Sequence, residues 1–301
     1  MRFRIERSGM FDTILVPTDD SAGADATIGH AIELGETYGS AVHALYVVEA
    51  GSAPTELPDD ERTTVRDRSE ARGREATIRV TDRAEERGLD AAREVREGVP
   101  YREVLSYTAN HDVDLVVMGT HGRTGADRVR LGSTTERVLT RADVPVLSVR
   151  LPEDGEPTPA AAVSYDRIVV PTDGSDHAER AAETALDVAE TYDAEVCAVY
   201  VVDSTTYDLE DAPRSIVGLL KEGGRNATEA IAEMAHDRGL DVRTDVRRGP
   251  PAEELLEYAS TIDASLVAMG TRGQTVGSGP LLGSTTARIV RRSTVPVLTV
   301  S

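Results

Sequence analysis

Short apolar runs alternate with longer stretches of helical periodicity along the whole chain. Four runs rich in Val, Leu and Ile predict strands in the first half, at 13–17, 42–48, 114–118 and 145–149. A fifth strand is expected near 90–96. The stretches between them predict helices from Ser21 to Gly39, up to about Gly88, just after Pro100, and from Ser133 to about Ala142.

The second half of the chain repeats the first. The segment 12–19 (DTILVPTD) returns as DRIVVPTD at 166–173. The segment 131–135 (LGSTT) returns unchanged at 282–286, and the order of apolar runs is also the same. We therefore expect an N-terminal arm, a first domain, a linker containing four Pro and Gly residues, and a second domain, at 1–10, 11–150, 151–164 and 165–301.

Strands that alternate with helices predict an α/β fold with a parallel sheet covered on both faces. Because crossovers between parallel strands are right-handed, each repeat is expected to form a doubly wound sheet. Ligands of such sheets bind beyond the carboxyl ends of the strands, where the strand order reverses.

The charge balance excludes some functions. There are 33 basic and 53 acidic residues, a net charge of -20, and this field disfavours general nucleic-acid binding. An acidic chain with one lysine, Lys221, resembles proteins of salt-loving cells. The single cysteine, Cys197, fits a reducing compartment, and no apolar stretch reaches membrane-spanning length, so a cytoplasmic protein without a membrane partner is expected.

A glycine pattern is repeated at the same spacing in both halves. Two glycines separated by two residues are followed, nine residues later, by Gly-Ser: Gly119, Gly122, Gly132 and Ser133, then Gly270, Gly273, Gly283 and Ser284. Seven of the nine intervening residues differ between the halves. Glycine at a strand end allows close approach of main chain to a ligand, and the free N–H groups of a following helix favour phosphate.

These residues resemble the ATP-binding branch of the universal stress protein family, whose motif is G-2X-G-9X-G-(S/T). Both halves match it, and both carry Pro-Thr-Asp-x-Ser at the end of the first strand, at 17–21 and 171–175. The resemblance implies two Rossmann-like sheets of five parallel strands in the order 3-2-1-4-5, similar to the adenine nucleotide alpha hydrolases. It also implies that the last strands, ending at Val149 and Val300, pair across a domain interface, as an internal dimer or in a homodimer.

The resemblance further implies one ATP or other adenine nucleotide per domain. Asp19 and Asp173 would contact adenosine, Val47 and Val201 the base, and the loop glycines and Ser-Thr-Thr runs the phosphates, with magnesium bridged by the phosphates and no protein metal ligand. The implied nucleotide-binding residues are Pro17, Thr18, Asp19, Val47, Met118, Gly119, Gly122, Gly132, Ser133, Thr134 and Thr135. In the second repeat they are Pro171, Thr172, Asp173, Val201, Met269, Gly270, Gly273, Gly283, Ser284, Thr285 and Thr286.

Simpler interpretations stay open beside this one. The glycines could be turn formers only, Asp19 a helix-capping residue, and Met118 and Met269 core residues. His30 and His43 are interpreted as ordinary packing residues and Cys197 as a core residue. His121 is replaced by Arg272, and the arginines Arg123, Arg128 and Arg130 occur only in the first loop, so the first site is expected to bind more tightly.

The expected function is a nucleotide-binding regulatory module of the stress response. No Walker A sequence, G-x-S-x-G, CxxC or G-x-G-x-x-G occurs. No catalytic residue is therefore assigned, and at most weak ATP hydrolysis is indicated. The alternatives are a slow ATPase or adenylating enzyme of the same superfamily, and a ligand-free scaffold.

Overall fold

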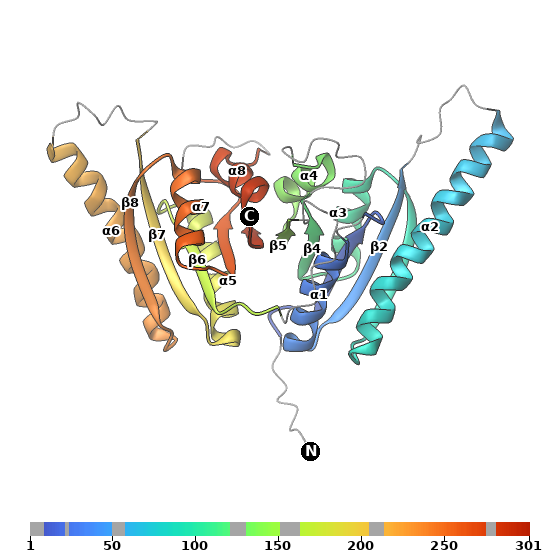
Figure 1. Cartoon of the computed structure of the whole chain (residues 1–301), viewed down its shortest axis with the longest axis horizontal. Coiled ribbons are helices and arrows are strands. Elements are labelled where there is room, and N and C mark those ends of the chain that lie inside the picture. Colours follow the sequence, from blue (N-terminus) through green and yellow to red (C-terminus); the bar gives the residue numbers. More distant parts are fainter. Residues whose placement is uncertain are drawn as a thin grey trace, which may run out of the picture. The chain divides into compact units, whose positions relative to one another are not determined.

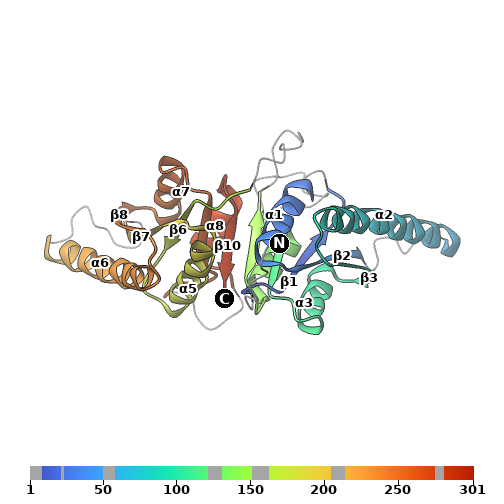
Figure 2. The same cartoon turned by 90° about the horizontal axis from the view of Figure 1, so that it is seen from below.

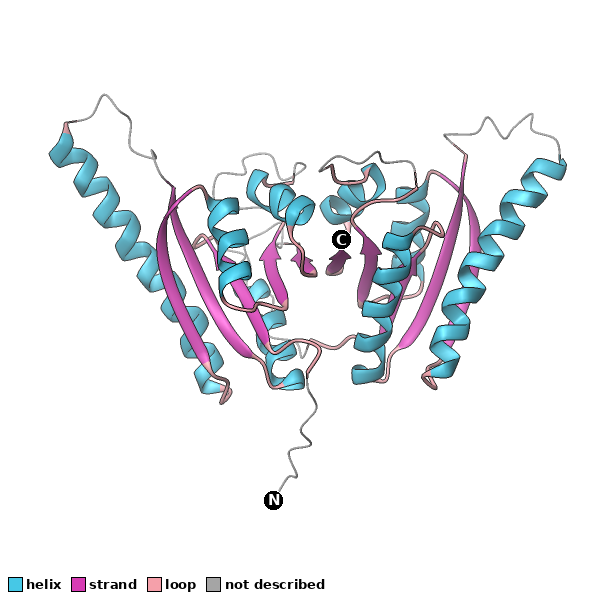
Figure 3. Cartoon of the chain, turned by 180° about the vertical axis from the view of Figure 1, so that it is seen from behind, coloured by secondary structure: helices cyan, strands magenta, loops and turns pink. Residues whose placement is uncertain are grey.

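The computed structural model of the chain describes residues 9–21, 24–49, 58–120, 131–150, 163–204, 214–274 and 281–301. The chain divides into two compact units. The first comprises Met1–Thr124 and Leu151–Val163, and the second Gly125–Arg150 and Ser164–Ser301. Each unit consists of strands alternating with helices, as Figures 1 and 3 show. The predicted boundaries at 11–150 and 165–301 follow the sequence repeat, whereas the contacts group residues 125–150 with the second repeat.

The first unit contains four parallel strands in the order β3-β2-β1-β4. Its elements, in chain order, are β1 (Thr13–Thr18), α1 (Ala24–Tyr38), β2 (Ala41–Glu49), α2 (Asp59–Glu86), β3 (Ala91–Gly98), α3 (Pro100–Asn110) and β4 (Leu115–Gly119). The helix expected from Ser21 begins as α1 at Ala24, whose N–H donates to the carbonyl of Ser21.

The second unit contains six strands in the order β5-β10-β9-β6-β7-β8. Its elements are α4 (Ser133–Arg141), β5 (Val146–Val149), β6 (Arg167–Pro171), α5 (Asp176–Tyr192), β7 (Glu195–Asp203), α6 (Arg214–Asp237), β8 (Val242–Gly249), α7 (Pro251–Thr261), β9 (Leu266–Gly270), α8 (Ser284–Arg292) and β10 (Val297–Val300). All neighbouring strands from β10 to β8 are parallel, and β5 alone runs antiparallel, to β10.

The predicted doubly wound α/β fold is confirmed, with one difference in detail. The second repeat shows the complete expected order 3-2-1-4-5, from β8 to β10. In the first repeat the fifth strand, β5, belongs to the second unit, where Leu147 lies opposite Leu298. The expected pairing of the two last strands is thus present. Both strands are four residues long and buried throughout, so each covers the apolar edge that the other would expose.

Helices cover both faces of the first unit's sheet. Tyr46 and Val48 of β2 pack with Ala76 of α2, whereas His43, an odd-numbered residue of the same strand, contacts Tyr107 of α3. Because side chains of a strand alternate between its faces, α2 and α3 lie on opposite faces. Figure 2 shows them on either side of β2 and β3. None of the helices in the described ranges has the length and apolar character needed to cross a membrane.

Two adjacent glycines of α6 provide a matched test of packing. A Cβ at Gly224 would lie 2.5 Å from Cδ1 of Tyr200, whereas one at Gly223 would meet nothing within 4 Å. We expect Gly223→Ala to raise the free energy of unfolding by about 0.5–1 kcal/mol, because alanine favours helix. Gly224→Ala should lower it by about 1–3 kcal/mol through overpacking. Urea unfolding of the two variants measures both; equal effects would contradict the close contact.

His30 of α1 makes stability depend on pH. Burial lowers its pKa from 6.5 to about 4. The folded protein therefore binds this proton less readily than the unfolded chain, so the stabilisation is complete above pH 6.5 and is lost as the pH falls towards 4. The second repeat has Thr184 at the equivalent position. His30→Thr should reduce the change in the free energy of unfolding between pH 6.5 and 4 by roughly 3 kcal/mol, which urea unfolding across that range measures. An unchanged slope would exclude His30 as its source.

Candidate functional site

The candidate site of the second unit lies at the carboxyl ends of β6 and β9. These two parallel strands are neighbours, with Ile168 opposite Leu266. After β6 the chain continues through α5 to β7 on one side, and after β9 it continues through α8 to β10 on the other. The strand order therefore reverses between β6 and β9, which is where doubly wound sheets bind their ligands.

Asp173 stands at the end of β6 in a tight turn. Its Oδ1 accepts a hydrogen bond of 3.0 Å from the N–H of Ser175, and Gly174 between them has a φ of 77°. That left-handed conformation suits glycine. The hydroxyl of Ser175 accepts from the N–H of Ala178 at 3.3 Å and caps α5. The Asp-x-Ser sequence thus builds the turn and starts the helix at once.

The loop after β9 lies directly on Asp173. The N–H of Gln274 donates to Asp173 Oδ2 at 2.9 Å, and the Gln274 side-chain amide donates to the Asp173 carbonyl at 2.7 Å. A Cβ at Gly273 would overlap Oδ2 of the same carboxylate, so a side chain there would force the carboxylate or the loop to shift. Each carboxylate oxygen accepts one main-chain hydrogen bond, which leaves about two of its four acceptor positions for a ligand.

Glycines also bring the first turns of α5 and α8 close to β9. A Cβ at Gly270 would lie 2.9 Å from the carbonyl oxygen of His177 in α5. The N–H of Gly283 donates to the carbonyl of Thr271 at 2.8 Å, and the buried hydroxyl of Thr286 donates to the carbonyl of Gly270 at 2.9 Å. Thr286 therefore holds the start of α8 against the end of β9.

The amino end of α8 has the features of an anion site. Gly283 is its N-cap, and no described side chain caps the helix there. The first-turn N–H groups of a helix have no acceptor within it and carry partial positive charge. Ser284 is exposed and Thr285 half-buried, so both hydroxyls are accessible from solvent.

Charged side chains of both signs lie around His177 in the first turn of α5. Partial burial lowers the pKa of His177, and the nearby charges of Arg180 and Arg272 lower it further. The carboxylates of Asp176 and Asp173 act in the opposite direction. Arg180 is engaged, since its Nη2 lies 2.6 Å from His177 Nδ1 and its Nε donates to the carbonyl of Ser301. Arg272 therefore adds a cation next to a neutral imidazole.

The remaining predicted residues of the second repeat differ in exposure. Pro171 and Met269 are buried, with Met269 only 6% exposed, so both contribute to the core. Val201 of β7 is half-buried, whereas Val199 and Val202 in the same strand are buried. The N–H of Thr172 donates to the carbonyl of Val199, and its hydroxyl accepts from Gly174 at 3.1 Å. Thr172 thus belongs to the framework of the turn.

The first repeat builds the same turn with different charges. The N–H of Ser21 donates to Asp19 Oδ1 at 3.1 Å, and Asp20 has a φ of 64° where the second repeat has Gly174. Asp20 forms an ion pair with Arg79 of α2. Five other predicted residues of this unit lie at or near strand ends, namely Pro17, Thr18, Val47, Met118 and Gly119.

The other predicted residues of the first repeat belong elsewhere. Gly132 caps α4 in the second unit, and Ser133, Thr134 and Thr135 form its first turn. Gly122 lies outside the described residues, as do His121, Arg123, Arg128 and Arg130. The complete arrangement is therefore seen in the second repeat, where a single unit holds every predicted residue.

Two residues of the site were missed from the sequence. Gln274 follows a motif glycine, but its hydrogen bonds to Asp173 join positions 101 residues apart and leave no local pattern. His177 lies in the first turn of α5, and its contact with Gly270 arises only when β9 and α5 pack together. The turn at Asp173 could have been found, because Asp-x-Ser occurs at the same place in both repeats.

A doubly wound α/β sheet that occurs twice in one chain defines a tandem protein of the Rossmann-like class. More particularly, the model of the universal stress protein family matches residues 10–150 and 164–301, and the chain belongs to that family.

Known relatives agree with this assignment. The chain is 40% identical to the universal stress protein MJ0531 of Methanocaldococcus jannaschii over 139 residues, which are 45% of this chain and 82% of the relative. It is 29% identical over 300 residues to a universal stress protein of Mycolicibacterium smegmatis, covering 95% and 96% of the two chains. The crystal structure of a universal stress protein from Archaeoglobus fulgidus matches 97% of each chain with a TM-score of 0.73 and 23% identity, which shows the shared fold.

Proposed function

We propose that this protein is a regulatory module of the stress response that binds one adenine nucleotide, ATP in the first instance, in each repeat. The observation that carries the proposal is the geometry around Asp173. A carboxylate fixed by two main-chain N–H groups, and still able to accept two hydrogen bonds, stands at the switch point beside the free amino end of α8. Membership of the universal stress protein family supports the same function.

Each part of a nucleotide has a chemically suited partner in the second unit. The Asp173 carboxylate accepts hydrogen bonds from ribose hydroxyls, and half-buried Val201 offers an apolar contact for the base. Main-chain N–H groups at the start of α8, with the hydroxyls of Ser284 and Thr285, suit the phosphates. Arg272 supplies the side-chain cation. In this way a chain with a net charge of -20 binds a polyanion without a Walker A lysine.

Magnesium would bind with the nucleotide rather than alone. The described residues contain no group of three His, Cys, Asp or Glu side chains placed to hold a metal ion. Magnesium takes oxygen ligands and usually keeps several waters, so phosphate oxygens, hydroxyls and water would complete its shell.

We also propose the wider organisation that the repeat suggests. Domains at 11–150 and 165–301, joined by a linker at 151–164, would form an internal pair in which β5 and β10 share a sheet. A cytoplasmic location suits the free, buried thiol of Cys197. Hydrolysis, if measured, should stay below about 1 per second, because an efficient enzyme turns over faster.

The first test is the stoichiometry of ATP binding by calorimetry. The unaltered protein should bind two ATP, Asp173→Ala one, and the double variant Asp19→Ala, Asp173→Ala none, because removing a charged acceptor weakens binding by about 1.5–3 kcal/mol per hydrogen bond. Asp241→Asn, at the opposite end of the second unit's strands, serves as the control and should still bind two. Two sites of unchanged affinity in the double variant would overturn the proposal.

The second test changes the loop glycine. Gly273→Ala places a Cβ against Asp173 Oδ2, so that the carboxylate or the loop must move. We expect ATP affinity at the second site to fall about ten- to a hundredfold, the equivalent of about 1.4–2.8 kcal/mol. Gly223→Ala, whose added Cβ meets nothing, is the matched control. If the two variants bind ATP equally well, the loop does not form part of the site.

A further inference from the structure

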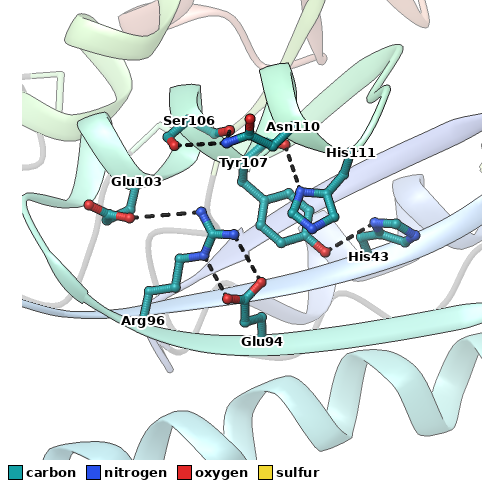
Figure 4. A network of polar contacts seen from close by, with 8 residues as sticks. All are labelled: His43, Glu94, Arg96, Glu103, Ser106, Tyr107, Asn110 and His111. Atoms are coloured by element: carbon teal, nitrogen blue, oxygen red, sulfur yellow. Dashed lines mark hydrogen bonds and ion pairs between the residues drawn. The ribbon is translucent and has the colours of Figure 1, made fainter.

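A cluster of titratable side chains joins α3 to β2 and β3 in the first unit, away from the nucleotide motif. We call it the His43 cluster and define it as His43, Glu94, Arg96, Tyr107 and His111. Figure 4 shows these residues together with the neighbouring Glu103, Ser106 and Asn110. His43 comes from β2, Glu94 and Arg96 from β3, and Tyr107 from α3, while His111 is the C-cap of that helix. The cluster therefore connects β2 to β3 and α3, which follow it in the chain only after the long helix α2.

Tyr107 is the centre of the cluster. Its side chain is 2% exposed, and its hydroxyl lies 3.1 Å from His43 Nδ1. The His111 ring stacks on the Tyr107 ring, with centroids 3.8 Å apart and an interplanar angle of 8°. The guanidinium carbon of Arg96 lies 4.8 Å from the centroid of the same ring. One buried tyrosine thus contacts both histidines and an arginine.

Arg96 is held by carboxylates. It donates to both oxygens of Glu94, at 2.8 and 3.0 Å, and lies 3.8 Å from an oxygen of Glu103. These carboxylates are therefore committed to the arginine. No described carboxylate forms an ion pair with His43, and an additional positive charge there has no direct counter-ion.

The second repeat keeps the frame of this cluster but lacks both histidines. Arg247 donates to Glu254 at 2.9 Å, lies 3.6 Å from Asp245, and has its guanidinium carbon 5.5 Å from the Tyr258 ring centroid. Cys197 stands where the first repeat has His43, and Ile262 stands where it has His111. The fold therefore does not require the histidines.

We propose that the His43 cluster is an acid-sensitive contact that holds α3 against β2 at neutral pH and loosens when His43 becomes protonated. The inference concerns the docking of a helix and does not depend on nucleotide binding. The same contact in the second repeat, built from Cys197 and Ile262, stays closed over this pH range.

The hydrogen bond between His43 and Tyr107 responds directly to protonation of His43. Neutral His43 accepts the hydroxyl hydrogen of Tyr107 at Nδ1, the tautomer that gives this buried hydroxyl an acceptor. Protonated His43 is a donor at Nδ1, so the hydroxyl hydrogen loses its acceptor. His111 Nδ1 lies 3.1 Å from the carbonyl oxygen of Tyr107. Protonation of His43 is therefore the step that reverses the hydrogen bond with Tyr107 and leaves the buried hydroxyl hydrogen without its acceptor.

Charge repulsion adds to the lost hydrogen bond. The ring centroids of His43 and His111 are 6.3 Å apart, and the Arg96 guanidinium lies over the Tyr107 ring that contacts both. Towards His43, α3 presents Tyr107 and His111, β3 presents Ala92 followed by Glu94 and Arg96, and β1 presents Leu15. A His43 imidazolium and the Arg96 guanidinium would then both contact one buried tyrosine.

The direction of the pH effect follows from burial. Desolvation lowers the pKa of His43 below 6.5, and the charge of His111 lowers it further. The folded state then binds the proton less readily than the unfolded or loosened state. The stabilisation from this contact is therefore complete above pH 6.5 and declines as the pH falls below it.

Amide hydrogen exchange of the full chain tests the proposal directly. Protection of α3, residues 100–110, is compared with that of α7, residues 251–261, at about pH 7.5 and about pH 5, corrected for the intrinsic exchange rate. We expect protection of α3 to fall about tenfold more than that of α7 on acidification, which corresponds to a cost of about 1.4 kcal/mol for a buried hydroxyl that loses its acceptor. An equal change in both helices would overturn the proposal.

The double variant His43→Cys, His111→Ile gives the first repeat the residues of the second. It should abolish the difference between α3 and α7, and persistence of the difference would contradict the proposal. A measurement on the unaltered protein covers the case in which the variant does not fold. The ring protons of His43 should titrate in the NMR spectrum below pH 6.5, and titration at or above 6.5 would equally refute the inference.

Discussion

The close approach of main chain to main chain at the carboxyl ends of β6 and β9 is the constraint on which the candidate site depends. Gly270 leaves room for the backbone of α5, and Gly273 leaves room for the Asp173 carboxylate. A Cβ at Gly273 would displace either the Asp173 carboxylate or the loop whose Gln274 N–H donates to it. The glycine spacing thus allows the two loops to approach closely.

The two repeats share a frame and differ in charge around it. Both contain the Thr-Asp turn, an Arg–Tyr contact at the edge strand, and a glycine of the long helix, Gly73 or Gly224, that packs closely on a tyrosine. The first repeat adds Asp20 with Arg79 at the turn, and two histidines around Tyr107. The second has Gly174 and Cys197 at the corresponding positions. The two repeats therefore keep a similar packing frame and carry different charged side chains around it.

Much of the fold could be predicted from the sequence, because strands such as Ile14–Val16 are buried on both faces and read as unbroken apolar runs. The helix cap at Ser175 and the turn at Asp173 involve only neighbouring residues, so the sequence also contains enough information to predict them. The grouping of β5 with the second unit was not, since a four-residue apolar strand does not specify its neighbour. His43 was interpreted as a packing residue for a related reason. Its contact with Tyr107 joins residues 64 positions apart and forms only when α3 packs on β2.

The antiparallel pairing of β5 with β10 has a consequence for any attempt to separate the repeats. A protein cut within 151–164 would leave the C-terminal piece without residues 146–149, and Leu298 with its neighbours would form a bare strand edge. Such an edge pairs readily with another copy of itself. The isolated C-terminal half should therefore self-associate through β10, so its behaviour in solution would reflect a missing strand and not the native assembly of the whole chain.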